Sequence, residues 1–531
     1  MLDDHSFRRF LCDKISRLIS CLEQPCKRNV NSSHYLIWDP LLSDPTSQFR
    51  PDELLMSTLP RDLENGLNIH RPIPLTVTAS RPPRDSTLAP IAKATPPLAL
   101  SKPQRKISRT LEFRLWFNTY RKFFTLVITL NLIGILLAAL DKWQYPRRYT
   151  GAFVLGNLQC AIIMRNELFG RLLYLIVNTL FAKWTPLWFR LACTSTLQHL
   201  GGIHSSCAVS GALWLVLRIV LIISEYHHYP PSIIAAGVVT GVAVFISIAS
   251  AFPWVRDAHH NVFEGYHRLV GWFGLASTWV FVILGDSYDI TTRTWNSNGV
   301  VRQQDFWFVA VMTVFVIIPW LTVRRVPVMV EVPSPKVAVI RFERGMQQGL
   351  LARISRGSML EFHAFGTISK GRQSDEHYLI CGVQGDFTQS LVDNPPKFLW
   401  TRQLKFAGVS NTSKLYKRGI RVCTGTGLGA ALSTCLQSPD WYLIWIGSDQ
   451  AKTFGETISA LIHDNLPPTQ YTLWDSKERG GRPDVMKLLK ETYISWGAEV
   501  VFITSNFGGN KEMMEGCKKE GIPAFGTLWD F

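Results

Sequence analysis

The chain has 531 residues, and since one compact core seldom exceeds roughly 250 residues, roughly two to four structural units are expected. It carries 56 Lys and Arg against 40 Asp and Glu, a formal net charge of +16, and 47% of its residues are hydrophobic. In a chain with apolar spans, such a basic excess is expected to set membrane orientation and contact anionic lipid, so no nucleic-acid partner is predicted.

Residues 1–110 are rich in Pro, Ser, Thr and Arg and show no apolar period. Such a composition buries too little apolar surface to fold, so this segment is predicted to be a disordered cytosolic tail. The start, MLDDHSFRRF, lacks the apolar stretch of a cleaved signal peptide, and the first membrane span is expected to act as the targeting signal.

Residues 111–325 are predicted to form a six-span α-helical membrane domain. The first span, Phe123–Leu140, contains no charged residue and is about long enough to cross the hydrocarbon core. The segment Phe169–Phe181, which contains Arg171, is expected to be interfacial, and Arg218 is expected to snorkel outward. The other spans are predicted at Ala152–Met164, Ile203–Ile223, Ile233–Ala251, Leu269–Leu284 and Phe306–Val323.

Basic residues predict the orientation of an integral membrane protein. Seven Lys and Arg residues lie between Lys102 and Lys122, before the first span, and Arg324 and Arg325 follow the last one. Both termini are therefore expected in the cytosol, with lipid as a partner. Lys142, Arg147 and Arg148, in a predicted outer loop, do not fit this pattern.

The pattern of apolar and polar residues changes after Val326. Residues 326–419 contain short alternating runs with glycine punctuation, which predict an antiparallel β-barrel. Residues 420–531 alternate strand-like and helix-like segments, which predict a parallel sheet with flanking helices, an α/β Rossmann-like domain.

Two motifs lie in the predicted barrel. In EFHAFGTIS, Phe365, Thr367 and Ser369 alternate along a strand, so they share one face and offer an apolar edge and hydroxyl groups for a flavin. Buried strands often look the same. In GDFT, Gly385–Thr388, Asp386 or Thr388 is expected to cap a helix whose free N–H groups suit a pyrophosphate; a plain helix cap is the equal alternative.

Three motifs lie in the predicted α/β domain. TGTGLGA, with Gly425, Thr426, Gly427 and Gly429, stands between a strand and a helix and is expected to bind a nucleotide pyrophosphate, although its spacing is not GxGxxG. In GGRPD, Asp484 is expected to cap the next helix, and Arg482 is expected either to reach a phosphate or to belong to a simple turn. Ser505 and Asn506 in SNFGGN follow a strand at the edge where ligands bind in such sheets.

In this order the motifs resemble those of the ferric reductase/NADPH oxidase superfamily, whose cytosolic half is a ferredoxin–NADP reductase-like module. More narrowly, the chain is similar to fungal TmpA-type integral membrane flavoproteins. HAFGTIS, starting at His363, resembles the HPFTI flavin strand, CTGTGLGA the GGTGI nucleotide loop, GRPD the GRP motif, and Phe531 the terminal aromatic residue over the flavin. The resemblance implies FAD and NADPH or NADH as cofactors. FAGVSNTSK and SNFGGN depart from the family's pattern.

The family holds two hemes, each between a histidine of the third span and one of the fifth. Here His199 and His204 precede the third span and His267 precedes the fifth. No histidine lies between His204 and His227 or from residue 268 to 320. The outer heme is therefore expected to be lost. At most one inner heme is implied, held by His267 with His199 or His204; hydrogen-bonded headgroup-level histidines are the preferred interpretation.

The predicted function is flavin-dependent electron transfer from NAD(P)H through FAD to an unidentified acceptor at the cytosolic membrane face, without a full heme wire. The alternative is a flavin-binding membrane sensor or scaffold with little turnover.

Overall fold

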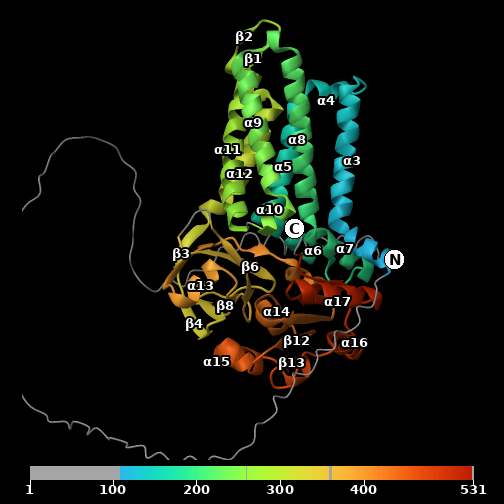
Figure 1. Ribbon diagram of the computed structural model, residues 1–531, viewed down its shortest axis with the longest axis vertical. Helices are drawn as coiled ribbons and strands as arrows, with labels where there is room; N and C mark the ends of the chain where they lie inside the picture. Colours follow the sequence, from blue (N-terminus) through green and yellow to red (C-terminus); the bar gives the residue numbers. More distant parts are fainter. Residues whose placement is uncertain (1–107, 259, 358–360, 529–531) are drawn as a thin grey trace, which may run out of the picture. The chain divides into compact units, whose positions relative to one another are not determined.

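The computed structural model describes residues 108–258, 260–357 and 361–528 (Figure 1). The predicted tail up to residue 107 and the predicted flavin-covering Phe531 lie outside these described residues.

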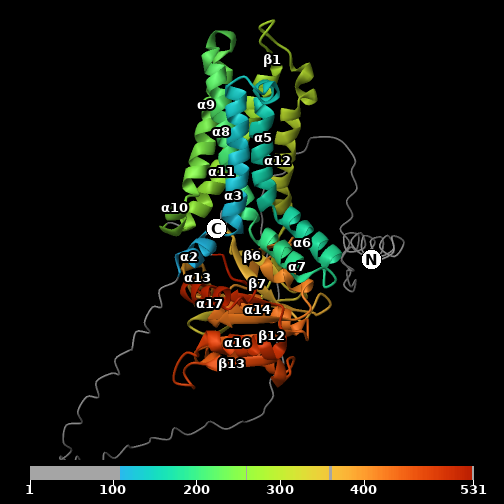
Figure 2. The same cartoon turned by 90° about the vertical axis from the view of Figure 1, so that its right-hand side faces the viewer.

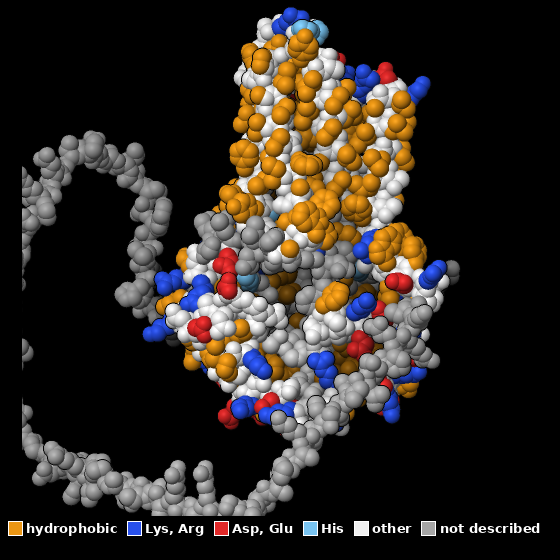
Figure 3. Space-filling model, viewed as in Figure 1, with side chains coloured by type: hydrophobic (Ala, Val, Ile, Leu, Met, Phe, Trp, Pro, Cys, Tyr) orange, Lys and Arg blue, Asp and Glu red, His pale blue; other side chains and the backbone are white. Residues whose placement is uncertain are grey.

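A bundle of long helices follows the short helix α2, Arg109–Trp116 (Figures 1 and 2). Five helices in the described part of the chain are long and apolar enough to cross a membrane. Hydrophobic side chains cover the face of the bundle seen in Figure 3. These helices are α3 (Thr119–Ala139), α8 (Leu200–Ser224), α9 (Pro231–Ser250), α11 (His260–Ser287) and α12 (Gln304–Leu321).

The remaining predicted span, Ala152–Met164, which is second in chain order, corresponds to the short helix α5, Thr150–Arg165, with 16 residues. At 1.5 Å per residue it is about 24 Å long, less than the roughly 30 Å of a hydrocarbon core. Val154 and Leu155 are nevertheless buried, each in a hydrophobic cluster of the bundle. The described residues thus form five helices of spanning length, with α5 packed among them.

The remaining short elements of the bundle are α4 (Gln144–Arg148), η1 (Tyr226–His228), α10 (Pro253–Ala258), β1 (Tyr288–Asp289), β2 (Thr294–Trp295) and η2 (Ser297–Arg302).

Helices α6 (Glu167–Phe181) and α7 (Leu187–Gln198) lie between α5 and α8 in the chain and bond to the C-terminal part. The predicted interfacial segment is α6. Asn166 caps α6 and also donates to Phe315 O of α12 at 2.7 Å. On α7, the buried Arg190 makes a bidentate ion pair with Glu499, at 2.7 and 3.0 Å. Burial by itself raises the pKa of Glu499, but Arg190 and the Lys417 N–H outweigh it and lower that pKa overall.

The predicted barrel is an eight-stranded sheet that stays open, a half-barrel with the strand order β3-β9-β6-β7-β8-β5-β4 and β10 paired to β6. All its pairings are antiparallel, as predicted. Ala338, Ile354 and Leu379 are fully buried between its strands. Its elements are β3 (Val323–Pro327), β4 (Met329–Ser334), β5 (Val337–Phe342), β6 (Leu350–Ser355), β7 (His363–Ile368), β8 (His377–Gly382), α13 (Asp386–Asp393), β9 (Phe398–Arg402) and β10 (Phe406–Ala407).

The last part is a five-stranded parallel sheet with the order β13-β12-β11-β14-β15. Helices α14 and α15 pack on one face and α16 and α17 on the other. The chain reverses direction across the sheet after β13, so β11 and β14 flank the switch point. The strands are β11 (Gly419–Thr424), β12 (Trp441–Gly447), β13 (Tyr471–Asp475), β14 (Val500–Thr504) and β15 (Ala524–Phe525). The helices are η3 (Val409–Leu415), η4 (Gly425–Gly427), α14 (Leu428–Leu436), α15 (Gln450–His463), η5 (Pro468–Gln470), α16 (Val485–Trp496) and α17 (Phe507–Lys519).

Candidate functional site

Two of the predicted motifs meet at the switch point of the parallel sheet. Thr424 ends β11 and Ser505 follows β14, and their hydroxyl oxygens lie 2.8 Å apart. A Cβ built at Gly427 would lie 2.4 Å from Thr504 O, so the turn after β11 runs close to the end of β14. This is the edge at which doubly wound sheets bind ligands.

The turn Gly425–Gly427 leaves space in front of the helix it precedes. Gly425 has φ +51°, a left-handed conformation that favours glycine, and no atom lies within 4 Å of a Cβ built there. Trp445 Nε1 donates to Gly425 O at 3.0 Å and fixes the turn. Because α14 starts directly after it and no side chain caps its first turn, the turn has the features of a phosphate site; the Leu428 N–H is bonded to Gly425 O within the turn.

A buried arginine of β11 bonds the helix that follows this turn. Arg421 on β11 is 1% exposed and donates to Ala430 O in α14 at 2.7 Å. Burial lowers the pKa of its guanidinium to about 10. Sequence reasoning missed Arg421 and Trp445; a charged residue inside the apolar strand IRVC was the available signal.

The edge of the sheet at the switch point also contacts the half-barrel. A Cβ at Gly366 in β7 would lie 2.6 Å from Ala430 Cα and 2.7 Å from Gly429 O. The Thr426 side chain covers the end of β8, where a Cβ at Gly382 would lie 2.7 Å from its Cγ2. The structure therefore brings the HAFGTIS, TGTGLGA and SNFGGN motifs together.

The hydroxyl groups of β7 are already bonded within the protein. Thr367 Oγ1 donates to Leu350 O at 2.9 Å, and Ser369 Oγ accepts from Met346 N at 3.0 Å. Both residues are 2% exposed. Phe365 packs on the core of the half-barrel. These three side chains therefore hold β7 in place, and Gly366 is where β7 directly meets α14.

The GDFT motif opens α13, and Thr388, one of the two predicted capping residues, takes part in its capping box. Gly385 is the N-cap, and the Thr388 hydroxyl accepts from Gln384 N and Gly385 N at 2.9 and 3.2 Å, while Asp386 is simply the first helical residue. No atom lies within 4 Å of a Cβ at Gly385. The ring of His363 in β7 stacks on that of Phe387, with ring centroids 4.0 Å apart, which joins this motif to β7.

Arg482 and Asn506 have more local surroundings. Arg482 is exposed, after the edge strand β13, and no contact with the other motifs is described for it. Asp484 caps α16 by accepting from Lys487 N at 3.1 Å, as predicted. Asn506 caps α17 by accepting from Gly509 N at 2.9 Å, so its side chain is already engaged.

The three candidate heme-ligand histidines each bond a backbone carbonyl through Nδ1: Ser195 O for His199, Ala161 O for His204 and Ser247 O for His267, at 2.7, 2.8 and 3.0 Å. This leaves Nε2 as the ring nitrogen able to bind a metal, which fits axial ligation chemically. The His204 and His267 bonds run to α5 and α9, so the same contacts also tie helices together.

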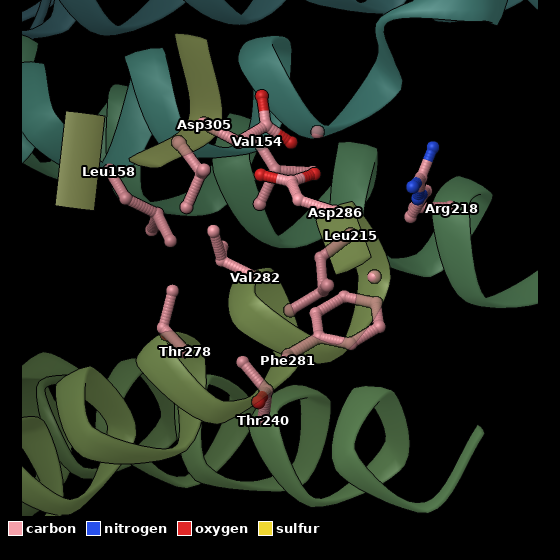
Figure 4. A pocket seen from close by; sticks show the side chains of 13 residues that line it. Val154, Leu158, Leu215, Arg218, Thr240, Thr278, Phe281, Val282, Asp286 and Asp305 are labelled. Atoms are coloured by element: carbon pink, nitrogen blue, oxygen red, sulfur yellow. The ribbon is translucent and has the colours of Figure 1, made fainter. Parts of the chain in front are cut away.

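Sequence reasoning missed a mainly apolar cavity in the bundle that also carries charged side chains (Figure 4). It has a volume of about 30 Å³, and its lining includes Arg218, Asp286 and Asp305. Arg218 lines this cavity close to the end of α8, and its outward snorkelling stays a prediction. The available signal was that Asp286 ends one apolar helix and Asp305 begins the next, which puts them at the same end of the bundle.

Comparison with known proteins connects the C-terminal part to reductases. Residues 409–531 match the family described as adenylate-forming reductase 03009, C-terminal domain. The chain is 28% identical over 442 residues to adenylate-forming reductase 06235 of Coprinopsis cinerea and 29% identical over 441 residues to adenylate-forming reductase 03009 of the same organism. Each alignment covers 81% of this chain and 42% of the relative, so the chain spans about two fifths of the length of these relatives.

Among solved structures, a phthalate dioxygenase reductase is similar at a TM-score of 0.31 with 9% identity, over 38% of this chain and 67% of that one. So low a TM-score adds nothing to the strand order described above. The described residues form five apolar helices of membrane-spanning length, an antiparallel half-barrel and a parallel α/β sheet. Over most of its length, the chain is therefore similar to part of two proteins named reductases.

Proposed function

We propose that the protein is a membrane-bound oxidoreductase that takes electrons from NADH or NADPH through FAD to an acceptor at the membrane face next to its half-barrel. The observation that supports this most directly is the position of the segment Thr424–Ala430, which contacts Ser505 through Thr424 on one side and meets β7 and β8 on the other. The reductase names of the two relatives support the same reaction class.

The nicotinamide nucleotide would bind at the switch point. The N–H groups of the turn and of the first turn of α14 would hold its pyrophosphate, and the Thr424–Ser505 hydroxyl pair would lie beside it. Arg421 and Trp445 keep the turn in place from inside the sheet. Because Asp286 and Asp305 lie inside the bundle, they have no part in this site.

For the flavin we propose fewer directly binding residues than the sequence predicts. The N-terminus of α13, open at Gly385 and flanked by the His363–Phe387 stack, would bind its phosphates. Thr367 and Ser369 would position β7 instead of bonding the cofactor. FAD, when bound, accepts a hydride from nicotinamide and can release electrons singly. Phe531 remains a prediction as its cover.

For the membrane part we propose six crossings, with α5 as the short one, and both termini in the cytosol. Residues 111–325, 326–419 and 420–531 would then be a ferric reductase-like membrane domain, a flavin domain and a nucleotide domain. At most one heme would be bound, by His267 with His199 or His204.

The decisive experiment is an absorption spectrum of the full chain purified in detergent, recorded without oxygen before and after NADH or NADPH. Flavin bands that bleach on addition support the proposal. Flavin that stays oxidised supports the sensor or scaffold alternative, and the absence of flavin contradicts both. A Soret band would establish the heme.

A pair of glycine variants locates the nucleotide site. Gly425→Val should abolish bleaching because it fills the open space of the turn. Gly521→Val is the matched control, since Gly521 also has a positive φ, +69°, and open space but precedes β15 away from the site. Equal loss of bleaching in both variants would contradict the assignment.

A further inference from the structure

A cluster of four basic side chains lies between α6 and one end of the half-barrel. Arg171 of α6 donates to Lys405 O at 3.4 Å. Lys405 Nζ donates to Thr401 Oγ1 and Arg402 O, each at 2.6 Å. Arg344 donates to Gln403 Oε1 at 2.9 Å, two residues before Lys405. The fourth member, Arg372, adds its charge from the loop after β7.

The hydrogen bonds described for this cluster end on neutral oxygens. The nearby acid on α6, Glu167, is already shared by Arg353 and Arg402, the latter at 2.9 Å. Glu343 is exposed, and no ion pair is described for it. His377, which bonds Arg344 O through Nδ1, is 2% exposed and its buried Nε2 has no partner among the described residues.

The electrostatic state of these groups reflects burial and the charges of their basic neighbours, which Glu167 offsets only in part at Lys405. Burial, followed by the charge of Arg344, lowers the pKa of Lys405 to about 7, and Lys405 is only 4% exposed. Burial, followed by the charges of Arg372 and Arg344, lowers the pKa of Arg171. Cations that are partly removed from water and lie near other cations are costly unless an anion joins them.

The cluster is open on one side and closed on the other. Arg344 and Arg372 are exposed, Arg171 is half-buried, and Lys405 forms the floor. Arg171 lies four residues after Glu167, and the cap of α6 is bonded to α12 of the bundle. The cluster is therefore adjacent to the end of the apolar bundle, where basic pockets bind phosphate-bearing headgroups.

We propose that Arg171, Arg344, Arg372 and Lys405 form a phosphate-binding site at the junction of the bundle and the half-barrel. Guanidinium groups bind phosphate oxygens in pairs, and an ammonium group adds a compact charge. The ligand is a phosphate monoester or free phosphate; the former would come from an anionic lipid headgroup. The site is separate from the Gly425 turn and from the start of α13.

The test uses the full chain in nanodiscs of phosphatidylcholine alone or with phosphatidic acid, and in detergent with inorganic phosphate. Native mass spectrometry would count retained lipid, and the thermal midpoint would report stabilisation. Retention and a raised midpoint with phosphatidic acid only support a lipid source; the same stabilisation by inorganic phosphate supports a free phosphate. No response to either ligand overturns the proposal.

Variants separate a site from general membrane charge. Arg171→Gln and Arg344→Gln should each weaken binding about tenfold, the effect of one lost charge-assisted contact. Arg325→Gln is the matched control, because Arg325 is an exposed arginine on β3 close to the end of α12. Equal weakening in all three variants overturns the proposal, and so does loss of bound flavin in parallel with lipid.

Discussion

The segment Thr424–Ala430 and the strand β7 meet where Gly366 approaches Gly429 and Ala430, yet the polar groups of the two segments are used in different ways. In the turn, Gly425 faces open space and the Thr424 hydroxyl lies at the switch point beside Ser505. In β7, the Thr367 and Ser369 hydroxyls are buried and bonded within the half-barrel. Both segments looked like ligand sites in sequence. The difference shows that hydroxyls on a strand indicate a ligand only when its neighbours leave them unpaired.

The largest expected effect is a loss of half-barrel stability at acidic pH. Burial lowers the pKa of His377, on the strand next to β7, from 6.5 to about 4. The folded protein therefore keeps this histidine neutral, and stability is full above pH 6.5 and falls as the pH drops towards 4. The loss is roughly 3 kcal/mol. Thermal midpoints across this range should show it, and His377→Phe should remove that slope; an unchanged slope would contradict it.

Next in size is the contact between β7 and α14. Gly366→Ala places a Cβ 2.6 Å from Ala430 Cα, and overpacking of this kind costs about 2 kcal/mol. Chemical denaturation of the purified protein measures the loss. Gly508→Ala is the control, because Gly508 lies in α17 with open space around it and alanine favours a helix. If both variants were equally stable, the close approach of β7 to α14 would be wrong.

A smaller effect is expected from the β7 hydroxyl. Thr367→Val leaves Leu350 O without its described side-chain donor and should cost about 1–2 kcal/mol of stability. Affinity for NADH or NADPH should stay unchanged because the group is buried. Denaturation and nucleotide titration on the same preparation check both statements. A weaker nucleotide affinity with normal stability would show that Thr367 binds ligand after all.

The smallest effect on stability is expected at the turn. Thr424→Val removes a half-buried hydrogen bond with Ser505 and should cost about 0.5 kcal/mol. It should, however, raise the KM for the nicotinamide nucleotide about threefold, the effect of one weak contact. Steady-state kinetics gives the KM. Thr424→Ser, which keeps the hydroxyl, should restore it; failure to do so would place the nucleotide elsewhere.

Much of the fold follows from local patterns in the sequence. Long apolar runs predicted α3, α8, α9, α11 and α12, because hydropathy and length suffice to define such helices. The strand–turn–helix at Thr424–Ala430 and the Asp484 cap were also predicted, since glycine turns and caps act over a few residues. The roles of the site residues remain predictions, although the structure gives the position of each one that it describes.

Other features depended on partners distant in the chain. The Thr367 hydroxyl is bonded 17 residues away and the Arg190–Glu499 pair joins residues 309 apart. Arg218, Asp286 and Asp305 line one cavity although they come from three helices.

The sequence alone therefore determined which segments become apolar helices, strands and glycine turns, because those depend on neighbours within a few positions. Only the tertiary structure decided which polar groups of those segments are already bonded and which remain open to a ligand. That decision is made by packing, which brings together residues whose separation in the chain carries no signal.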